Sequence, residues 1–295
     1  MVTECVAGAT DSVTEANAIA DAVPALLRRD ETGAVTVEIG GSSRAKGSMN
    51  EDAYLVDESH QLFGVFDGVG ATAQAAQAAR LAAESIRAAY RHHGPGLDRA
   101  VERTFLPLTV AGAGVLIAAT LADGLTTASV VKVCDTADGT ATALVCNIGD
   151  SRVYRYTTGG ELHQCTLDDS PFGADWDLQL RLSEVEVPMS LLEHTYFARR
   201  HVMDRALGER LASPRLWETT ALEGDVLLAV SDGVTDNLTL SEMRRLLRGG
   251  NGSRRVAQRL VDAATARSRD TGHPRAKVDD ITAVAARLGL SRVRH

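Results

Sequence analysis

Two short apolar runs in this chain each end in Asp-Gly, and they constrain the possible folds more than any other feature. LFGVFDG ends at Asp67-Gly68, and DVLLAVSDG ends at Asp232-Gly233. A nearly all-apolar run of this length is typical of a strand that is covered on both faces. Glycine lets the chain turn sharply and approach a ligand closely. Each run therefore predicts a buried strand that brings a carboxylate to the rim of a sheet.

Acidic pairs also precede two other predicted strands. Glu51 and Asp52 come before AYLVD, and Asp279 and Asp280 begin the last strand. Carboxylates gathered at one rim repel one another and need cations. Their hard oxygen atoms favour Mg²⁺ or Mn²⁺ over softer metals. A single Asp-Gly is usually only a turn, so the combination, and not any one of its members, predicts a metal site.

The other elements are predicted from periodicity and turn residues. The Ala-rich segment 71–93 predicts a helix, which Gly94-Pro95-Gly96 ends. A second helix is expected over 97–121 despite Pro107. Amphipathic helices are expected over 241–248 and 253–268, with Ser241 and Ser253 as N-caps. Strands are predicted over 36–43, 53–57, 62–68, 126–133, 142–149, 152–156, 225–233 and 280–288.

Runs of strands and runs of helices are segregated, which favours an α+β fold over a doubly wound parallel sheet. The 295 residues fit one main domain. We expect an N-terminal extension over 1–34, a core over 35–288 and a tail over 289–295. The segment 166–200 lacks periodicity and is expected to be an irregular insertion.

Composition excludes several classes of protein. With 31 basic and 39 acidic residues the net charge is −8, which argues against a nucleic-acid coat or an anchor to an anionic membrane. Cys5, Cys134, Cys146 and Cys165 lack zinc-finger spacing and are expected to be reduced thiols. The N-terminus has no secretory signal pattern, and the apolar stretch 110–122 is too short to span a bilayer. We therefore expect a cytoplasmic monomer.

Five motifs occur in a fixed order with suitable gaps. They read NEDAY, VFDGVG with a following helix, IGDSRVY, AVSDGVTD and DDIT. This order resembles the metal-dependent serine/threonine protein phosphatases of the PPM (type 2C) family, over about 35–288. The resemblance implies a four-layer α-β-β-α sandwich of two antiparallel sheets flanked by helices. It also implies two central Mn²⁺ or Mg²⁺ ions at one edge, and possible binding of a third.

The resemblance assigns ligands by position. Asp67 would bridge the two central metals, and the Gly68 carbonyl would bind one of them. Glu51, Asp232 and Asp280 would complete the other, with Asp279 as an alternative ligand to Asp280. Asp52 would have a supporting role. Asp123, in DGLTT, is either a ligand of the third metal or part of a plain turn, and both interpretations stay open.

The resemblance also implies a reaction. A water that bridges two metals becomes a hydroxide, which attacks phosphorus in line with no covalent intermediate. The substrate would be a phosphoserine or phosphothreonine of a protein. The segment 166–200 corresponds to the family's flap, and ALGE (206–209) to a stretch after it. Asp150 and Arg152 are expected to hold a turn rather than to act in catalysis.

Two positions depart from the family pattern. Many members have an arginine that binds the substrate phosphate four residues before the metal-binding glutamate, where this chain has Gly47. Lys46 and Arg44 lie nearby and are the candidates for that contact, although a lysine lacks the bidentate fork of arginine. Where eukaryotic members often have a histidine after Asp-Gly, this chain has Val69.

Two other functions stay open from the sequence. A regulatory pseudophosphatase would keep the fold and turn over poorly, as the missing arginine suggests. The same hydrolase could also act on a small phosphorylated metabolite. Retention of the clustered acids favours the active phosphatase, because a purely structural scaffold gains nothing from clustered negative charge.

Overall fold

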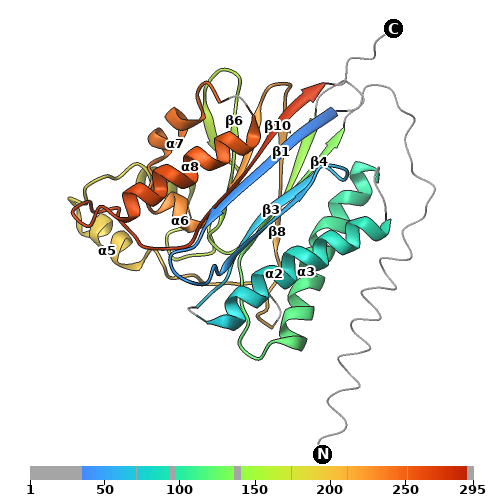
Figure 1. Cartoon of the computed structure of the whole chain (residues 1–295), viewed down its shortest axis with the longest axis horizontal. Helices are drawn as coiled ribbons and strands as arrows, with labels where there is room; N and C mark the ends of the chain where they lie inside the picture. Colours follow the sequence, from blue (N-terminus) through green and yellow to red (C-terminus); the bar gives the residue numbers. More distant parts are fainter. Residues whose placement is uncertain are drawn as a thin grey trace, which may run out of the picture.

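Two antiparallel five-stranded sheets pack face to face, with helices on both outer sides (Figure 1). The computed structural model describes residues 35–70, 72–93, 97–135, 141–173, 175–210, 212–250 and 252–290. This architecture confirms the predicted α+β sandwich. The predictions for 1–34, for Cys5 and for 291–295 lie outside the described residues.

The first sheet has the strand order β1-β10-β9-β6-β7. Its strands are β1 (Val35–Arg44), β10 (Ile281–Leu290), β9 (Val226–Val230), β6 (Arg152–Tyr156) and β7 (Leu162–Gln164). The longest pairing joins β1 to β10 from Val35↔Leu290 to Arg44↔Ile281. This register places the end of β1 beside the start of β10.

The second sheet has the order β2-β3-β4-β5-β8. Its strands are β2 (Asp52–Asp57), β3 (Leu62–Asp67), β4 (Ala128–Asp135), β5 (Ala141–Ile148) and β8 (Arg215–Ala221). The β2–β3 hairpin pairs Asp52 with Asp67. One acidic residue of the first predicted pair therefore lies directly opposite the first Asp-Gly.

Alternation along β3 and β9 explains why both sequences are apolar throughout. Phe63 and Val65 of β3 belong to the core between the sheets, together with Leu227 and Ala229 of β9. The alternate side chains of β3 pack under the outer helices on one side, and those of β9 on the other. Both strands are therefore covered on both faces, as predicted.

The helices form the two outer layers. Helices α2 (Ala73–His93) and α3 (Arg99–Thr120) cover the second sheet, and α7 (Leu240–Leu247) and α8 (Ser253–Ser268) cover the first (Figure 1). Of the described helices, α3 alone is long and apolar enough to cross a membrane by length and composition. Its Phe105, Leu106, Val110 and Ile117 are buried in the core against the second sheet, and Leu108 and Val115 are exposed on its outer face.

The predicted N-caps were wrong for both C-terminal helices. The cap of α7 is Thr239, which forms a capping box with Glu242. The residue before α8 is Gly252, at φ 87°. Ser253 instead donates from Oγ to the carbonyl of Glu38 at 2.6 Å, which ties α8 to β1.

The insertion 166–200 is more regular than expected. It contains α4 (Trp176–Ser183) and α5 (Leu191–Arg199), capped by Asp175 and Ser190. Helices this short show little periodicity in a sequence, which explains why they were missed. The short α6 (Asp232–Thr235) and the strand β8 were also not foreseen. Among the described residues, no disulfide joins Cys134, Cys146 or Cys165.

A buried polar group supports the packing of α2 on α3. The hydroxyl of Tyr90 donates to Glu102 Oε2 at 2.8 Å, and the Glu102 side chain is almost fully buried.

Replacing Tyr90 by Phe should lower the free energy of unfolding by about 1–3 kcal/mol, because a buried carboxyl loses a donor. Tyr156→Phe is the control, since no hydrogen bond of its hydroxyl occurs among the described residues. Equal urea midpoints for the two variants would contradict this account.

Candidate metal centre

A cavity of about 170 Å³ opens at one end of the sandwich, where loops from both sheets meet. It is bordered by the β1–β2 loop, the end of β3, the turn after β5, the start of α6 and the loop before β10. The stretch after α5 also reaches it, and Figure 1 shows α5 and α6 at the same end of the molecule. The lining residues are Lys46, Glu51, Asp67, Gly68, Val69, Gly70, Thr127, Asp150, His201, Met203, Asp232, Lys277 and Asp279.

Asp67 reaches the cavity because β3 ends there in a fixed turn. Its N–H donates to Thr127 Oγ1 at 2.9 Å, and its carbonyl accepts from the Thr127 N–H at 2.8 Å. A Cβ on Gly68 would lie 2.6 Å from the Ala75 carbonyl oxygen and 2.8 Å from that of Glu51. Glycine is therefore required at this position, as the sequence predicted from the sharp turn.

The second Asp-Gly turn begins α6 and packs against Asp280, the residue just before the last strand. A Cβ on Gly233 would lie 2.0 Å from the carbonyl oxygen of Asp280, so only glycine allows this approach. Ser231 donates from Oγ to Asp52 Oδ2 at 2.9 Å. Burial raises the pKa of Asp52 to about 7, with Asp232 and Asp280 adding to the shift. Asp52 thus holds Ser231, the residue before this Asp-Gly turn, and does not itself line the cavity.

The structure distinguishes the two candidate acids before β10. Both oxygens of Asp280 accept backbone hydrogen bonds, from the N–H of Lys46 at 2.6 Å and that of Glu51 at 2.8 Å. Its side chain is 1% exposed and does not line the cavity. Asp279 does line the cavity. Asp280 therefore positions the β1–β2 loop, and Asp279, the alternative, is the better candidate ligand.

Two lysines lie among the acids. The ammonium of Lys46 contacts Glu51 Oε2 at 2.8 Å and Asp279 Oδ1 at 3.2 Å. Lys277 contacts Asp232 Oδ2, with Asp279 Oδ2 at 3.1 Å. Their carboxylate neighbours raise the pKa of both lysines against the effect of burial, so both are charged at neutral pH. The sequence analysis did not single out Lys277.

Other carboxylate oxygens in the cavity have no such neutralisation. Among the described residues, the carboxylates of Asp67 and Asp150 have no hydrogen-bond or ion-pair partner, and Asp232 Oδ1 is buried without one. Burial raises the pKa values of Asp67 and Asp150 well above the usual range, and repulsion by neighbouring aspartates adds to this. Asp150, expected only to hold a turn, is thus part of the acidic centre.

Three other predicted residues lie elsewhere. Arg44 pairs with Asp262 of α8 at 2.9 Å and does not line the cavity, so the structure does not support it as a phosphate contact. Asp123 is exposed, its N–H donates to Gln74 Oε1, and it does not line the cavity either. Arg152 forms a bidentate pair with Asp168 at 2.9 and 2.7 Å, consistent with its predicted structural role.

The residues present fit a hard divalent cation on one side of the cavity only. Among the residues described, the carboxylates of Asp67 and Asp150 have no ion-pair partner, and with Asp232 Oδ1 and the Gly68 carbonyl they offer hard oxygen atoms that no ammonium contacts directly. On the other side, Glu51, Asp279 and Asp232 Oδ2 are already paired with lysine. Within the described part of the chain, no three His, Cys, Asp or Glu side chains form a ready cluster for a metal ion.

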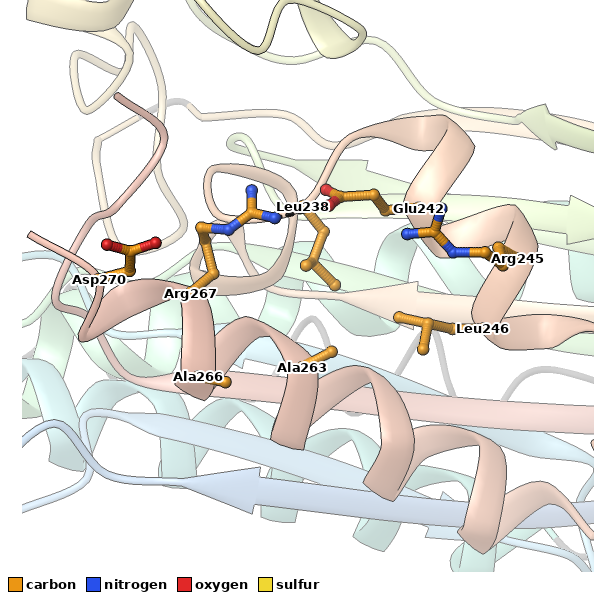
Figure 2. A pocket seen from close by; sticks show the side chains of 8 residues that line it. All are labelled: Leu238, Glu242, Arg245, Leu246, Ala263, Ala266, Arg267 and Asp270. Carbon is orange, nitrogen blue, oxygen red and sulfur yellow. Dashed lines mark hydrogen bonds and ion pairs between the residues drawn. The ribbon is translucent and has the colours of Figure 1, made fainter. Parts of the chain in front are cut away.

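A second cavity, of about 370 Å³, lies away from this centre between α7 and α8 (Figure 2). Its floor is formed by Leu238, Leu246, Ala263 and Ala266, with charged residues around it. Arg267 pairs with Glu242 at 2.6 Å. Nothing in it resembles a reactive group, so the smaller acidic cavity is the candidate active site.

Comparison with known proteins agrees with the fold. No family model and no curated protein matches this sequence. Among solved structures, the catalytic domain of the Ser/Thr phosphatase PstP, in complex with two manganese ions, superposes with a TM-score of 0.67 at 22% identity. The alignment covers 87% of this chain and 100% of that one.

Two further structures give the same result. The PPM Ser/Thr phosphatase MsPP of Mycobacterium smegmatis, in complex with cacodylate, matches at 26% identity and TM-score 0.67, over 87% of this chain and 100% of that one. Stp1 of Staphylococcus aureus matches at 20% identity and TM-score 0.67, over 88% of this chain and 98% of its own. The chain therefore has the fold of the bacterial PPM Ser/Thr phosphatases over most of its length.

Removing one unpaired acid should stabilise the protein in the absence of metal. Asp67→Asn is expected to raise the free energy of unfolding at pH 8 by about 0.5–2 kcal/mol in EDTA. Folding raises the pKa of Asp67, so the folded state holds this proton more tightly than the unfolded state does. The protein therefore loses stability as the pH rises from the unfolded pKa of an aspartate through the folded pKa of Asp67. The wild type should be less stable at pH 8 than at pH 5. Urea unfolding at both pH values measures this.

The matched control is Asp123→Asn, which removes an exposed carboxylate outside the cavity. It should leave the difference between pH 5 and pH 8 unchanged. An Asp67→Asn variant with the wild-type pH dependence, or with lower stability at pH 8, would contradict the proposed repulsion.

Proposed function

We propose that this protein hydrolyses phosphoserine and phosphothreonine monoesters of proteins with the help of Mn²⁺ or Mg²⁺. The observation that carries this proposal is the presence in one cavity of two carboxylates without an ion-pair partner among the described residues, Asp67 and Asp150, beside Asp232 Oδ1 and the Gly68 carbonyl. A bound cation would relieve the repulsion among such carboxylates and keep them ionised. The fold shared with bacterial PPM Ser/Thr phosphatases supports the same function.

Each residue of the site would have a separate role. Asp67, the Gly68 carbonyl and Asp232 Oδ1 would hold the cation. When bound, a divalent cation lowers the pKa of a coordinated water and neutralises charge on a phosphoryl group. Asp150 is placed to accept a hydrogen bond from a water in the cavity. Lys46, one-third exposed, uses two N–H groups in hydrogen bonds to Glu51 and Asp279, and its third N–H can donate to a phosphoryl oxygen.

A proton donor for the leaving group is also available in the cavity. His201 lines it, and it follows directly after the insertion that carries α4 and α5. Imidazole is the side chain best suited to proton transfer near neutral pH. No local pattern in the sequence marks His201, because only the fold brings it to the cavity that the acids line.

A protein substrate fits the surroundings better than a small metabolite. The insertion that ends beside the cavity exposes Val187, Met189 and Leu191, and Val278 next to Asp279 is 67% exposed. An extended peptide can cover such apolar side chains, whereas a metabolite would need polar groups that enclose it. A pseudophosphatase is the second candidate, and the pairing of both lysines with carboxylates favours it.

Hydrolysis of p-nitrophenyl phosphate and of a phosphothreonine peptide tests the proposal directly. Turnover should require Mn²⁺ or Mg²⁺, stop in EDTA and fall by at least about 100-fold in Asp67→Asn, as for loss of an essential electrostatic group. Asp262→Asn on α8 is the matched control and should keep full activity. Metal-independent turnover, or full activity in Asp67→Asn, would overturn the proposal. Metal binding without turnover of either substrate would favour the pseudophosphatase.

Gly47→Arg tests whether the missing phosphate contact limits activity. A Cβ at Gly47 meets no atom within 4 Å, so the position can accept a side chain. An arginine there adds a bidentate donor beside Lys46, and KM for the phosphothreonine peptide should fall about threefold or more with little change in kcat. Gly159→Arg, in the β6–β7 turn, adds the same charge elsewhere. An unchanged KM in Gly47→Arg would mean that Lys46 already supplies this contact.

A further inference from the structure

The lysines of the acidic centre suggest how many cations it takes. We propose that the ammonium groups of Lys46 and Lys277 replace one of the two central cations expected of this fold. The centre then holds a single divalent cation, at the side of Asp67, Asp150 and Gly68. This inference rests on the proposed metal-dependent function of the same site and specifies its cation content.

The carboxylates of the cavity fall into two groups by their ion pairs. In the first group, the two ammonium groups contact Glu51, both oxygens of Asp279, and Asp232 Oδ2. These are the non-bridging carboxylates assigned to one metal of the pair, with Asp279 in place of Asp280. In the second group, Asp67 and Asp150 form no ion pair with any described residue. Asp232 Oδ1, the other oxygen of the carboxylate that pairs with Lys277, accepts no hydrogen bond from the residues that the structure describes. The described part of the chain therefore places an ammonium in direct contact with the first group and none in direct contact with Asp67 or Asp150.

Lys277 is built into the centre. The side-chain amide of Asn237 holds its backbone on both sides, accepting from the Lys277 N–H at 3.0 Å and donating to its carbonyl at 2.9 Å. A further carboxylate, Asp236, contacts the Lys277 ammonium at 2.7 Å. Asp236 is buried, and its ion pair with Arg200 is longer, at 3.6 Å. Moving Lys277 aside would leave Asp236 buried with poor compensation, which is costly.

Lys46 is held by the acid that does not line the cavity. Asp280 accepts from the backbone N–H groups of Lys46 and Glu51, which fixes the loop that carries both. The Lys46 ammonium then meets Glu51 and Asp279 from the side of the β1–β2 loop. Asp279 thus lies between the two lysines, with one oxygen on each.

The use of lysine in this chain agrees with this role. The sequence has three lysines, at positions 46, 132 and 277, and otherwise uses arginine for positive charge. Two of the three therefore lie in this one cavity. An ammonium is a compact point charge that can approach several carboxylates at once, as a metal ion does, whereas a guanidinium is planar and wider.

Counting bound Mn²⁺ by titration calorimetry and native mass spectrometry tests the inference without relying on activity. All proteins carry Asp123→Asn, so that a third, exposed ligand adds no ion. We expect one Mn²⁺ per chain in this background and two after Lys46→Ser/Lys277→Ser, which frees the paired carboxylates. Arg44→Ser/Arg248→Ser removes the same charge outside the cavity and should still bind one. If the double lysine variant does not fold, as judged by circular dichroism, Lys277→Ser alone replaces it.

Each outcome of the count is informative. Two ions with the lysines present would overturn the inference and leave the proposed function standing. One ion both with and without the lysines would also overturn it, because the lysines would then not set the number. No bound ion, together with no turnover of p-nitrophenyl phosphate, would overturn the inference and the proposed function together.

Discussion

Repulsion among carboxylates at one end of the sandwich is the constraint on which the rest of this structure depends. Asp67, Asp150, Asp232 and Asp279 line one small cavity, and burial there raises the pKa values of the first three. Such a group forms only if the fold pays for it elsewhere. Here Lys46 and Lys277 neutralise part of the negative charge through ion pairs, and the carboxylate of Asp67 has no such partner among the described residues. We expect function at the part of the cavity around Asp67.

The sheets bring these acids together through close backbone contacts. Gly68 lies against the backbone of Ala75 and Glu51, and Gly233 lies against the carbonyl of Asp280. Neither contact leaves room for a Cβ. Direct packing of backbone on backbone therefore fixes the position of each Asp-Gly turn. The apolar strands before these turns are covered on both faces, which makes the turns rigid. Sites built on strands are positioned more precisely than sites built on loops.

The segregated runs of strands and helices predicted an α+β fold, and the resemblance to the PPM family predicted the sandwich. Apolar strands that end in Asp-Gly can be recognised locally, which is why the sequence already marked Asp67 and Asp232 as site candidates. The sequence could not distinguish Asp279 from Asp280, because neighbouring residues point in opposite directions and the backbone donors to Asp280 come from a distant loop. Lys277 was missed for a similar reason, since its role depends on Asn237, 40 positions away. Arg44 lies close to the site in sequence and yet pairs with α8.

A crystal structure of the protein grown with Mn²⁺, with the ions located by their anomalous scattering, would show directly how many ions this centre holds. We expect one manganese peak per chain, bound by Asp67 and the Gly68 carbonyl, with Lys277 still in contact with Asp232 and Asp236. Two peaks bridged by Asp67, with both lysines displaced, would contradict the replacement of a cation by lysine. The absence of any peak at Asp67 would contradict the metal centre itself.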